Sequence, residues 1–106
     1  MSDARTVYVT AADEGQAATL ARALLERRLI ACANLLPGMR SFYRWKGDVQ
    51  DEGEVAMLLK TAASRVDDVI AAVEELHPYD TPCVVVWGIE AGSEAYLRWV
   101  VAESGG

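Results

Sequence analysis

Long apolar runs and positive charge are both scarce in this sequence. No stretch approaches the ~20 consecutive apolar residues that a membrane-spanning helix needs, so we expect no membrane partner. Lys and Arg together number 10 against 16 Asp and Glu, which gives a net charge of −6 at pH 7. Nucleic-acid-binding domains normally present a basic surface to the phosphates, so we expect no nucleic acid as a partner.

Secretory and disulfide features are missing as well. Residues 1–6 are polar and lack the apolar stretch behind a basic start that marks a signal peptide. We therefore expect a cytoplasmic protein. Thiols stay reduced in the cytoplasm, so the two cysteines, Cys32 and Cys83, are expected as free thiols and not as a disulfide.

The motifs of several enzyme classes are also absent. The sequence has no Gly-rich phosphate loop, no His-Glu-x-x-His helix and no Gly-x-Ser-x-Gly nucleophile elbow. No pair of residues suggests general acid–base catalysis. We therefore expect a protein that is not an enzyme.

What the sequence does contain is enough apolar material for one folded domain. Its 106 residues are 52% hydrophobic and 25% charged, as in ordinary soluble proteins. A domain of this length buries roughly 65% of the surface that its unfolded chain exposes, so it can fold without metals or disulfides. We expect a single domain over residues 1–106.

Hydrophobic periodicity predicts four strands and three helices in the order β-α-β-β-α-β-α. The third strand is expected to follow a polar segment at 49–53, and residues 104–106 are expected to fray. The strands are predicted at 6–11, 30–45, 54–62 and 83–89, and the helices at 14–28, 65–76 and 94–103.

Polar residues at the predicted helix starts have the spacing of capping motifs. Asp13 with Gln16 and Ser64 with Asp67 resemble capping boxes, and Ser93 can cap the last helix. In each case we expect the side-chain oxygen to accept a backbone N–H that the first helical turn leaves free.

Turn residues predict a long hairpin in the middle of the chain. Pro37-Gly38 interrupts the second strand and predicts a bend or bulge within it. Lys46-Gly47-Asp48 is typical of a turn, after which the chain returns as the third strand. His77-Pro78 is expected to end the second helix, because proline disfavours helical geometry at the preceding residue.

This element order is that of a ferredoxin-like α+β fold, with two helices on one face of a four-stranded antiparallel sheet. Side chains alternate along a strand, so Val55, Met57 and Leu59 point to one face and Ala56, Leu58 and Lys60 to the other. The fourth strand is apolar on both faces, so the face without helices would carry a sizeable apolar patch. Lone monomers rarely expose such an apolar patch, which favours an oligomer. The alternative is that the short terminal helix folds over this face.

Several segments of the chain, taken in order, are similar to those of one known family. The segments are Ala31–Gly38, Ser41–Gly47, Leu59–Thr61, His77–Tyr79 and Tyr96–Trp99, together with Glu54 and Pro82. They cover nearly the whole chain, and they resemble the CutA (divalent-cation-tolerance) family. The resemblance implies a homotrimer of ferredoxin-like subunits whose long second and third strands extend into neighbouring subunits. It also implies a role in tolerance of divalent cations, copper above all, since some members are reported to bind copper.

Two residues, Cys32 and His77, are candidate metal ligands. A reduced thiol can ligate Cu(I), although a free cysteine within a strand is commonly a small buried hydrophobe. An imidazole suits copper or zinc, while at a helix end it can instead bond free carbonyls. Copper-binding relatives have a cysteine and a second histidine where this chain has Val9 and Leu76. We therefore expect no obligatory cofactor, with copper or another divalent metal as the candidate ligand.

A ligand cleft between subunits is the second candidate site. Glu54 and Lys60 lie six residues apart in one strand and so project to the same face. Lys60 could bind an anion there, or pair with a carboxylate of a neighbouring subunit. Tyr79, Tyr43 and Trp45 could line the same cleft, or belong to a core or interface. These residues support a second functional hypothesis, a signalling or scaffold trimer that binds a small anionic ligand.

Overall fold

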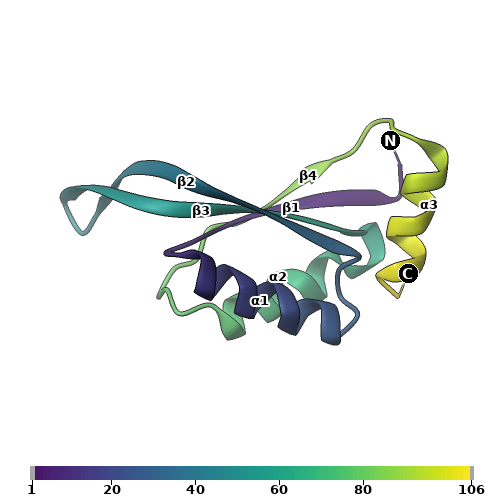
Figure 1. Ribbon diagram of the computed structural model, residues 1–106, viewed down its shortest axis with the longest axis horizontal. Coiled ribbons are helices and arrows are strands. Elements are labelled where there is room, and N and C mark those ends of the chain that lie inside the picture. Colours follow the sequence, from purple (N-terminus) through teal and green to yellow (C-terminus); the bar gives the residue numbers. More distant parts are fainter. Residues whose placement is uncertain (1, 106) are drawn as a thin grey trace.

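The computed structural model describes residues 2–105, which form a four-stranded antiparallel sheet with three α-helices (Figure 1). The strands lie in the order β2-β3-β1-β4 across the sheet. This arrangement confirms the predicted ferredoxin-like α+β fold with an additional C-terminal helix. The elements are β1 (Ala4–Ala11), α1 (Glu14–Glu26), β2 (Cys32–Trp45), β3 (Asp48–Ala62), α2 (Val66–Leu76), β4 (Val84–Gly88) and α3 (Glu94–Glu103).

The helices α1 and α2 cover one face of the sheet, and the hydrophobic core lies between these two layers (Figure 1). Val7 and Met57 project into it from the two central strands, and both are fully buried. Leu24 of α1 and Val69 and Val73 of α2 meet them from the helical side. Burying each such side chain contributes roughly 1.5–3 kcal/mol relative to leaving it exposed, so this layer contact stabilises the domain.

Local hydrogen bonds define both ends of α1. At its start, Oδ1 of Asp13 accepts a 2.8 Å hydrogen bond from the backbone N–H of Gln16, as predicted. The Gln16 side chain in turn accepts a hydrogen bond from the N–H of Ala12 at 3.2 Å, one residue earlier than a capping box requires. The helix ends at Glu26, two residues before the predicted end, because Arg28 adopts a left-handed φ of 57° in a Schellman motif.

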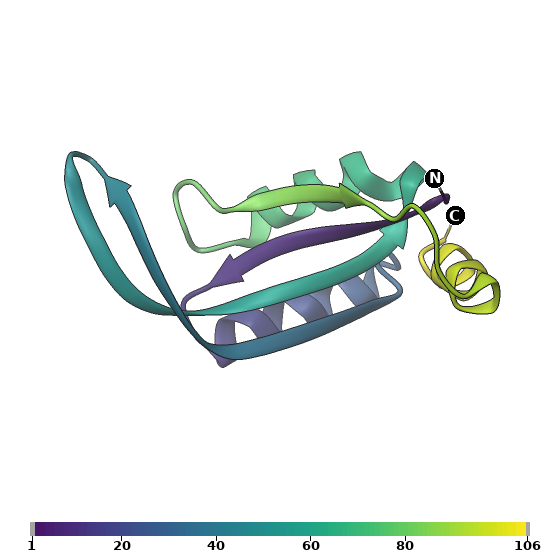
Figure 2. The ribbon, with the colours of Figure 1, turned by 90° about the horizontal axis from the view of Figure 1, so that it is seen from above.

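The β2–β3 hairpin is longer than the sequence predicts, because β3 begins at Asp48 and not at Glu54. The polar segment 49–53, expected to precede the strand, pairs in register with residues 40–44 of β2. It lacks the apolar pattern of a strand because β1 pairs only with residues 55–62 of β3 and offers it no core. Residues 39–54 therefore form a two-stranded hairpin arm that projects beyond the sheet (Figure 2).

Residues with positive φ shape this hairpin at two points. A register shift between Leu36 and Met39 confirms the predicted bulge, where Gly38 has a φ of 82°. At the tip, Lys46 and Gly47 have φ values of 50° and 88°, as a type I′ turn requires at its two central positions. The turn matches the right-handed twist of the two strands that it joins.

The start of α2 differs from the prediction. A 3₁₀ turn over Ala63–Arg65 precedes the helix, and Ser64 lies within that turn. The N-cap position falls on Arg65, which makes no side-chain capping bond to the described residues. The turn follows β3 directly because the N–H of Ala63 is held by the carbonyl of Asp3 at 2.7 Å. The other end is as predicted, since His77 is extended and closes the helix.

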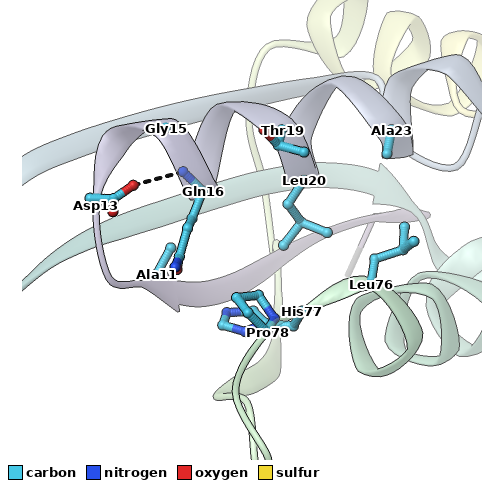
Figure 3. A pocket seen from close by; sticks show the side chains of 10 residues that line it. All are labelled: Ala11, Asp13, Gly15, Gln16, Thr19, Leu20, Ala23, Leu76, His77 and Pro78. Atoms are coloured by element: carbon cyan, nitrogen blue, oxygen red, sulfur yellow. Dashed lines mark hydrogen bonds between the residues drawn. The ribbon is translucent and has the colours of Figure 1, made fainter.

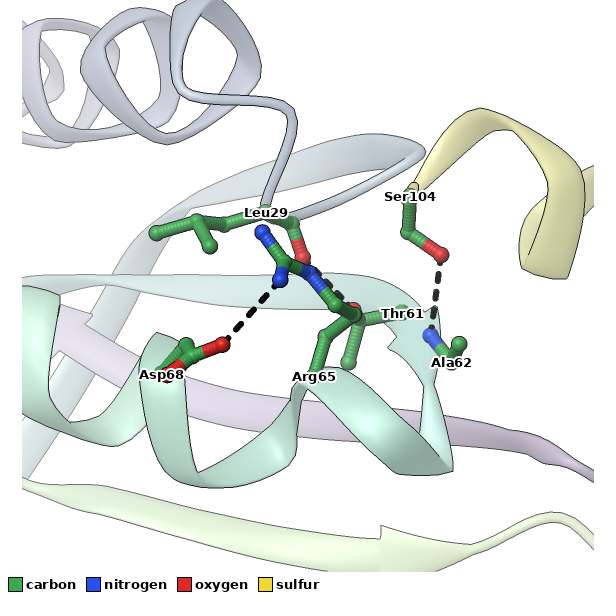
Figure 4. A network of polar contacts seen from close by, with 6 residues as sticks. All are labelled: Leu29, Thr61, Ala62, Arg65, Asp68 and Ser104. Carbon is green, nitrogen blue, oxygen red and sulfur yellow. Dashed lines mark hydrogen bonds and ion pairs between the residues drawn. The ribbon is translucent and has the colours of Figure 1, made fainter. Parts of the chain in front are cut away.

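The helix α3 stands at one end of the sheet and is anchored there by Ser104 (Figure 4). The Ser104 hydroxyl accepts a 3.0 Å hydrogen bond from the N–H of Ala62, and the residue is fully buried. The prediction that fraying begins at 104 is therefore wrong, while residue 106 lies outside the described residues. Beside this contact, the Thr61 hydroxyl donates a 2.6 Å hydrogen bond to the carbonyl of Leu29 (Figure 4).

The face of the sheet opposite α1 and α2 is open in the single chain. Val85 and Trp87 of β4 are 46% and 49% exposed on it. Tyr8 stacks on Trp87 with ring centroids 5.2 Å apart. Since α3 lies at one end of the sheet (Figures 1 and 2), it covers only that end of the open face, where Ala62 is buried, and leaves Val85 and Trp87 exposed.

Candidate functional site

A cleft with a volume of about 600 Å³ lies where the hairpin arm leaves the sheet. Its walls come from β1, the hairpin arm and the loop that precedes β4. It belongs to the open face, because Glu54 alternates with the core-facing Val55 and Met57. The polar and aromatic side chains that line it are Tyr8, Thr10, Ser41, Phe42, Tyr43, Trp45, Glu52, Glu54, Tyr79, Asp80, Thr81 and Cys83.

Two carboxylates in the cleft accept hydrogen bonds from tyrosines. The Tyr79 hydroxyl donates to Oε2 of Glu54 at 2.8 Å, and the Tyr43 hydroxyl donates to Oε2 of Glu52 at 3.1 Å. Glu54 is only 9% exposed, which is rare for a carboxylate without partners. The structure thus brings together four of the predicted cleft residues, since Trp45 lines the same cleft as Glu54, Tyr43 and Tyr79.

The cleft disfavours additional negative charge. Burial, the hydrogen bond to Glu54 and the charge of Glu54 together raise the pKa of Tyr79 far above its ordinary value. Burial and the same carboxylate also raise the pKa of the Cys83 thiol, which a hydrogen bond with Thr10 opposes. Burial is the main cause of the raised pKa of Tyr8, and the charges of Cys83 and Glu54 add to it. At neutral pH these phenols and the thiol therefore stay protonated beside the carboxylates.

His77 lies against a second hollow, of about 570 Å³, between α1 and the end of α2 (Figure 3). Its Nε2 lies 2.7 Å from the carbonyl oxygen of Thr10, and its Nδ1 accepts a 3.1 Å hydrogen bond from the N–H of Tyr79. A carbonyl oxygen only accepts, so Nε2 carries the proton and the ring is the neutral Nε2–H tautomer. Both ring nitrogens are engaged, and a metal ion at His77 would have to displace one of these bonds.

Cys32 and Lys60 lie at the opposite end of the sheet from the cleft, beside α3. They are cross-strand partners, and Sγ of Cys32 lies 3.5 Å from the hydroxyl of Tyr96. The hydrogen bond with Cys32 is the main cause that raises the pKa of Tyr96 to about 12, and burial adds to it. Nζ of Lys60 donates a 3.3 Å hydrogen bond to Oδ1 of Asn34. Lys60 is therefore not part of the cleft that contains Glu54.

The two candidate metal ligands are far apart within one chain. Cys32 is paired with Lys60, whereas His77 contacts Thr10, which is paired with Ala56. The two β3 positions are four residues apart, which is about 13 Å along a strand. Within residues 2–105, no group of three or more His, Cys, Asp or Glu side chains is placed to hold a metal ion.

The comparison with known proteins is decisive for the family. The family described as "CutA1 divalent ion tolerance protein" matches residues 5–103, nearly the whole chain. The chain belongs to the CutA1 divalent ion tolerance family. The resemblance found in the sequence is thereby confirmed.

Individual CutA proteins agree with this assignment. The divalent-cation tolerance protein CutA of Pectobacterium atrosepticum is 41% identical over 102 residues, which cover 96% of this chain and 93% of that protein. The crystal structure of CutA from Xylella fastidiosa gives a TM-score of 0.93 at 35% identity, covering 96% of this chain and 98% of that one. The CutA1 structure from Thermus thermophilus gives a TM-score of 0.90 at 38% identity, covering 94% and 97%.

Within this CutA fold, sequence reasoning missed other residues of the cleft, among them Tyr8, Glu52 and Asp80. A signal for Tyr8 was available, because it alternates with the core-facing Val7 and Val9 and must face the open side. Glu52 was obscured because its segment was interpreted as a connection and not as a strand. The position of Asp80 depends on the loop after α2, which no periodicity describes.

Proposed function

We propose that this CutA chain acts in tolerance of divalent cations as a homotrimer that catalyses no reaction. The single observation that carries the proposal is the family match over residues 5–103. The relatives are named for divalent-cation tolerance, and the proposal extends that role to this chain. The open sheet face and the hairpin arm support the trimer, and Cys32 supports the contact with metal.

The trimer is supported by surfaces that a single chain leaves without cover. Val85 and Trp87 expose apolar area on the open face, and Phe42 and Val49 of the hairpin arm are each 64% exposed. Isolated two-stranded ribbons are marginally stable in water. Packing these exposed side chains against neighbouring chains would bury them, and the family resemblance supplies the number three.

The metal contact is proposed at Cys32, in the cytoplasm, where its thiol stays reduced. A thiolate is a preferred ligand of Cu(I). The thiol is partly exposed, and among the described side chains its hydrogen-bond partner is the Tyr96 hydroxyl. Further ligands would come from a neighbouring subunit or from solvent.

Among the helices in residues 2–105, none is long and apolar enough to cross a membrane.

A copper(I) titration with a competing chelator tests this proposal. We would use the reduced protein, the Cys32→Ser variant and a matched Cys83→Ser variant, and record the mass of each by light scattering. We expect binding that Cys32→Ser abolishes and Cys83→Ser retains, with the mass of three chains throughout. Binding that is equal in all three proteins would reject the Cys32 site, and the mass of a single chain would reject the trimer.

The alternative, a trimer that binds a small anion in the cleft, is not favoured by the geometry. Its proposed counter-charge, Lys60, bonds to Asn34 away from the cleft. The cleft contains Glu52, Glu54 and Asp80 instead. An anion placed there would meet like charge, which costs binding free energy.

A further inference from the structure

We infer that the cleft at the base of the hairpin arm binds a small organic cation, namely a protonated amine joined to an apolar or aromatic body. The inference goes beyond tolerance of divalent metals and involves a different part of the fold from Cys32. It rests on the size and aromatic walls of the cleft, on the buried carboxylate within it, and on the single sign of its charge.

The cleft has the dimensions and walls of a site for an organic molecule. Its volume of about 600 Å³ lies within the ~300–1,000 Å³ typical of small-molecule pockets. Tyr8 of β1 and Tyr43 and Trp45 of β2 supply aromatic surface to it. Aromatic rings attract cations to their faces and also pack against apolar groups. An amine with an apolar body uses both properties.

Glu54 supplies an anchoring charge with unused hydrogen-bonding capacity. The residue is only 9% exposed, and its Oε2 accepts the hydrogen bond from Tyr79. In the part of the chain that the structure describes, no hydrogen bond reaches its Oε1. A carboxylate oxygen that lines a cleft is a strong acceptor for an ammonium N–H, because such charge-assisted bonds are about twice as strong as neutral ones.

The charge around this anchor has one sign. Glu52 and Asp80 line the cleft with Glu54, and among the described residues that line it there is neither Lys nor Arg. Carboxylates grouped in a concave site concentrate their field and attract cations. The raised pKa of Tyr79, due first to burial and then to Glu54, is consistent with this field.

The arrangement suits an ammonium ion better than a metal ion. A hard divalent cation needs several oxygen ligands that converge on one point. Residues 2–105 contain no such group of three acidic, His or Cys side chains. The hydroxyl protons of Tyr79 and Tyr43 point to the carboxylates, so these phenols are hydrogen-bond donors and not metal ligands. A protonated amine needs only one or two acceptors and an apolar wall.

The test uses three probes with the same phenyl body. Isothermal titration calorimetry of the assembled full-length protein at pH 7 would compare phenethylammonium, 2-phenylethanol and 3-phenylpropionate. We expect phenethylammonium to bind once per subunit, 2-phenylethanol to bind at least about tenfold more weakly, and 3-phenylpropionate not to bind. Binding should weaken as salt is added.

Variants then locate the site. Glu54→Gln keeps the size of the side chain and should weaken phenethylammonium binding by about tenfold, while its trimer mass and Cu(I) binding stay unchanged. Glu74→Gln, on the exposed side of α2, is the matched control and should change nothing. The second cleft variant, Glu52→Gln, should weaken binding in the same direction.

Four outcomes would overturn the inference. They are binding of 3-phenylpropionate as tight as that of the amine, no effect of Glu54→Gln, competitive displacement of the amine by equimolar Mg²⁺, and failure of every probe to bind the assembled protein. The last result would mean that the cleft of the single chain is not available in the assembled protein. None of these outcomes affects the proposed Cu(I) contact, because that contact is measured separately with Cys32→Ser.

Discussion

The hydroxyl of Tyr79 donates a 2.8 Å hydrogen bond to the nearly buried carboxylate of Glu54. This bond ties the loop after α2 to the point on β3 where the hairpin arm begins. His77, which closes α2, fixes the same loop from the other side through its bonds to Thr10 and to the Tyr79 N–H. The position of the cleft carboxylate therefore depends on a loop that two side chains hold in place.

Replacing Tyr79 by Phe should destabilise the protein. The substitution removes the donor to Glu54 and leaves a nearly buried carboxylate without that partner, which typically costs ~1–3 kcal/mol. Urea unfolding at fixed protein concentration measures the change. Tyr43→Phe is the matched control, because Glu52, its partner, is exposed. An equal effect of the two substitutions would contradict the special role of Glu54.

Tyrosine ionisation should occur at higher pH in the folded protein than in the unfolded chain. Tyr8, Tyr43, Tyr79 and Tyr96 all have raised pKa values, with burial as the main cause except at Tyr96, where the hydrogen bond with Cys32 comes first. The folded state thus retains phenol protons that the unfolded chain releases near pH 10.0. The stability that these phenols contribute is fully present below that pH and is lost as the pH rises above it.

Absorbance at 295 nm, recorded against pH for folded and urea-unfolded protein, checks this prediction. We expect the folded curve at higher pH, and Tyr79→Phe should remove its most shifted component. Coincident curves for the two states would refute it.

Ser104→Ala should loosen the attachment of α3. The Ser104 hydroxyl accepts a hydrogen bond from the N–H of Ala62 (Figure 4). It also donates a 2.6 Å hydrogen bond to the carbonyl of Val100. Without it, the buried N–H of Ala62 has no partner, a loss of about 1–3 kcal/mol. Hydrogen exchange at the Ala62 amide should accelerate together with the loss of stability. In the control Ser93→Ala, an exposed cap is lost and the Ala62 amide should be unaffected.

Trp87→Glu should dissociate the proposed trimer. The substitution places a charge on the open face, where assembly would have to desolvate it. Light scattering and analytical ultracentrifugation should report single chains, while circular dichroism retains the signal of the folded sheet. Arg22→Glu on the exposed side of α1 is the control and should leave the mass unchanged. A trimer that persists in Trp87→Glu would show that this face is not the contact.

The element order, the bulge at Pro37-Gly38 and the separation of the third strand's side chains into two faces could be predicted because each depends on local periodicity or turn chemistry. The start of β3 could not, because residues 48–54 pair with β2 alone and face no core that would impose an apolar pattern. Ser104 was misjudged for a related reason, since its burial depends on docking against β3 and not on its neighbours in sequence.

The cleft was predicted only in part. Glu54 and Lys60 project to the same face of β3 because they lie an even number of residues apart. They are not close together, however, because six residues of a strand span about 20 Å. The residues that do meet Glu54 come from the loop after α2 and from the hairpin arm, whose positions follow from tertiary packing.

The hairpin arm makes the two halves of β2 and β3 unequal. Residues 55–62 of β3 lie between two strands, while residues 48–54 lie beside one. The first half is stabilised by the chain's own core, whereas in the proposed trimer the second half is stabilised by contact with other chains. Dilution should therefore denature this protein selectively. The arm should unfold at protein concentrations at which the body of the sheet remains folded.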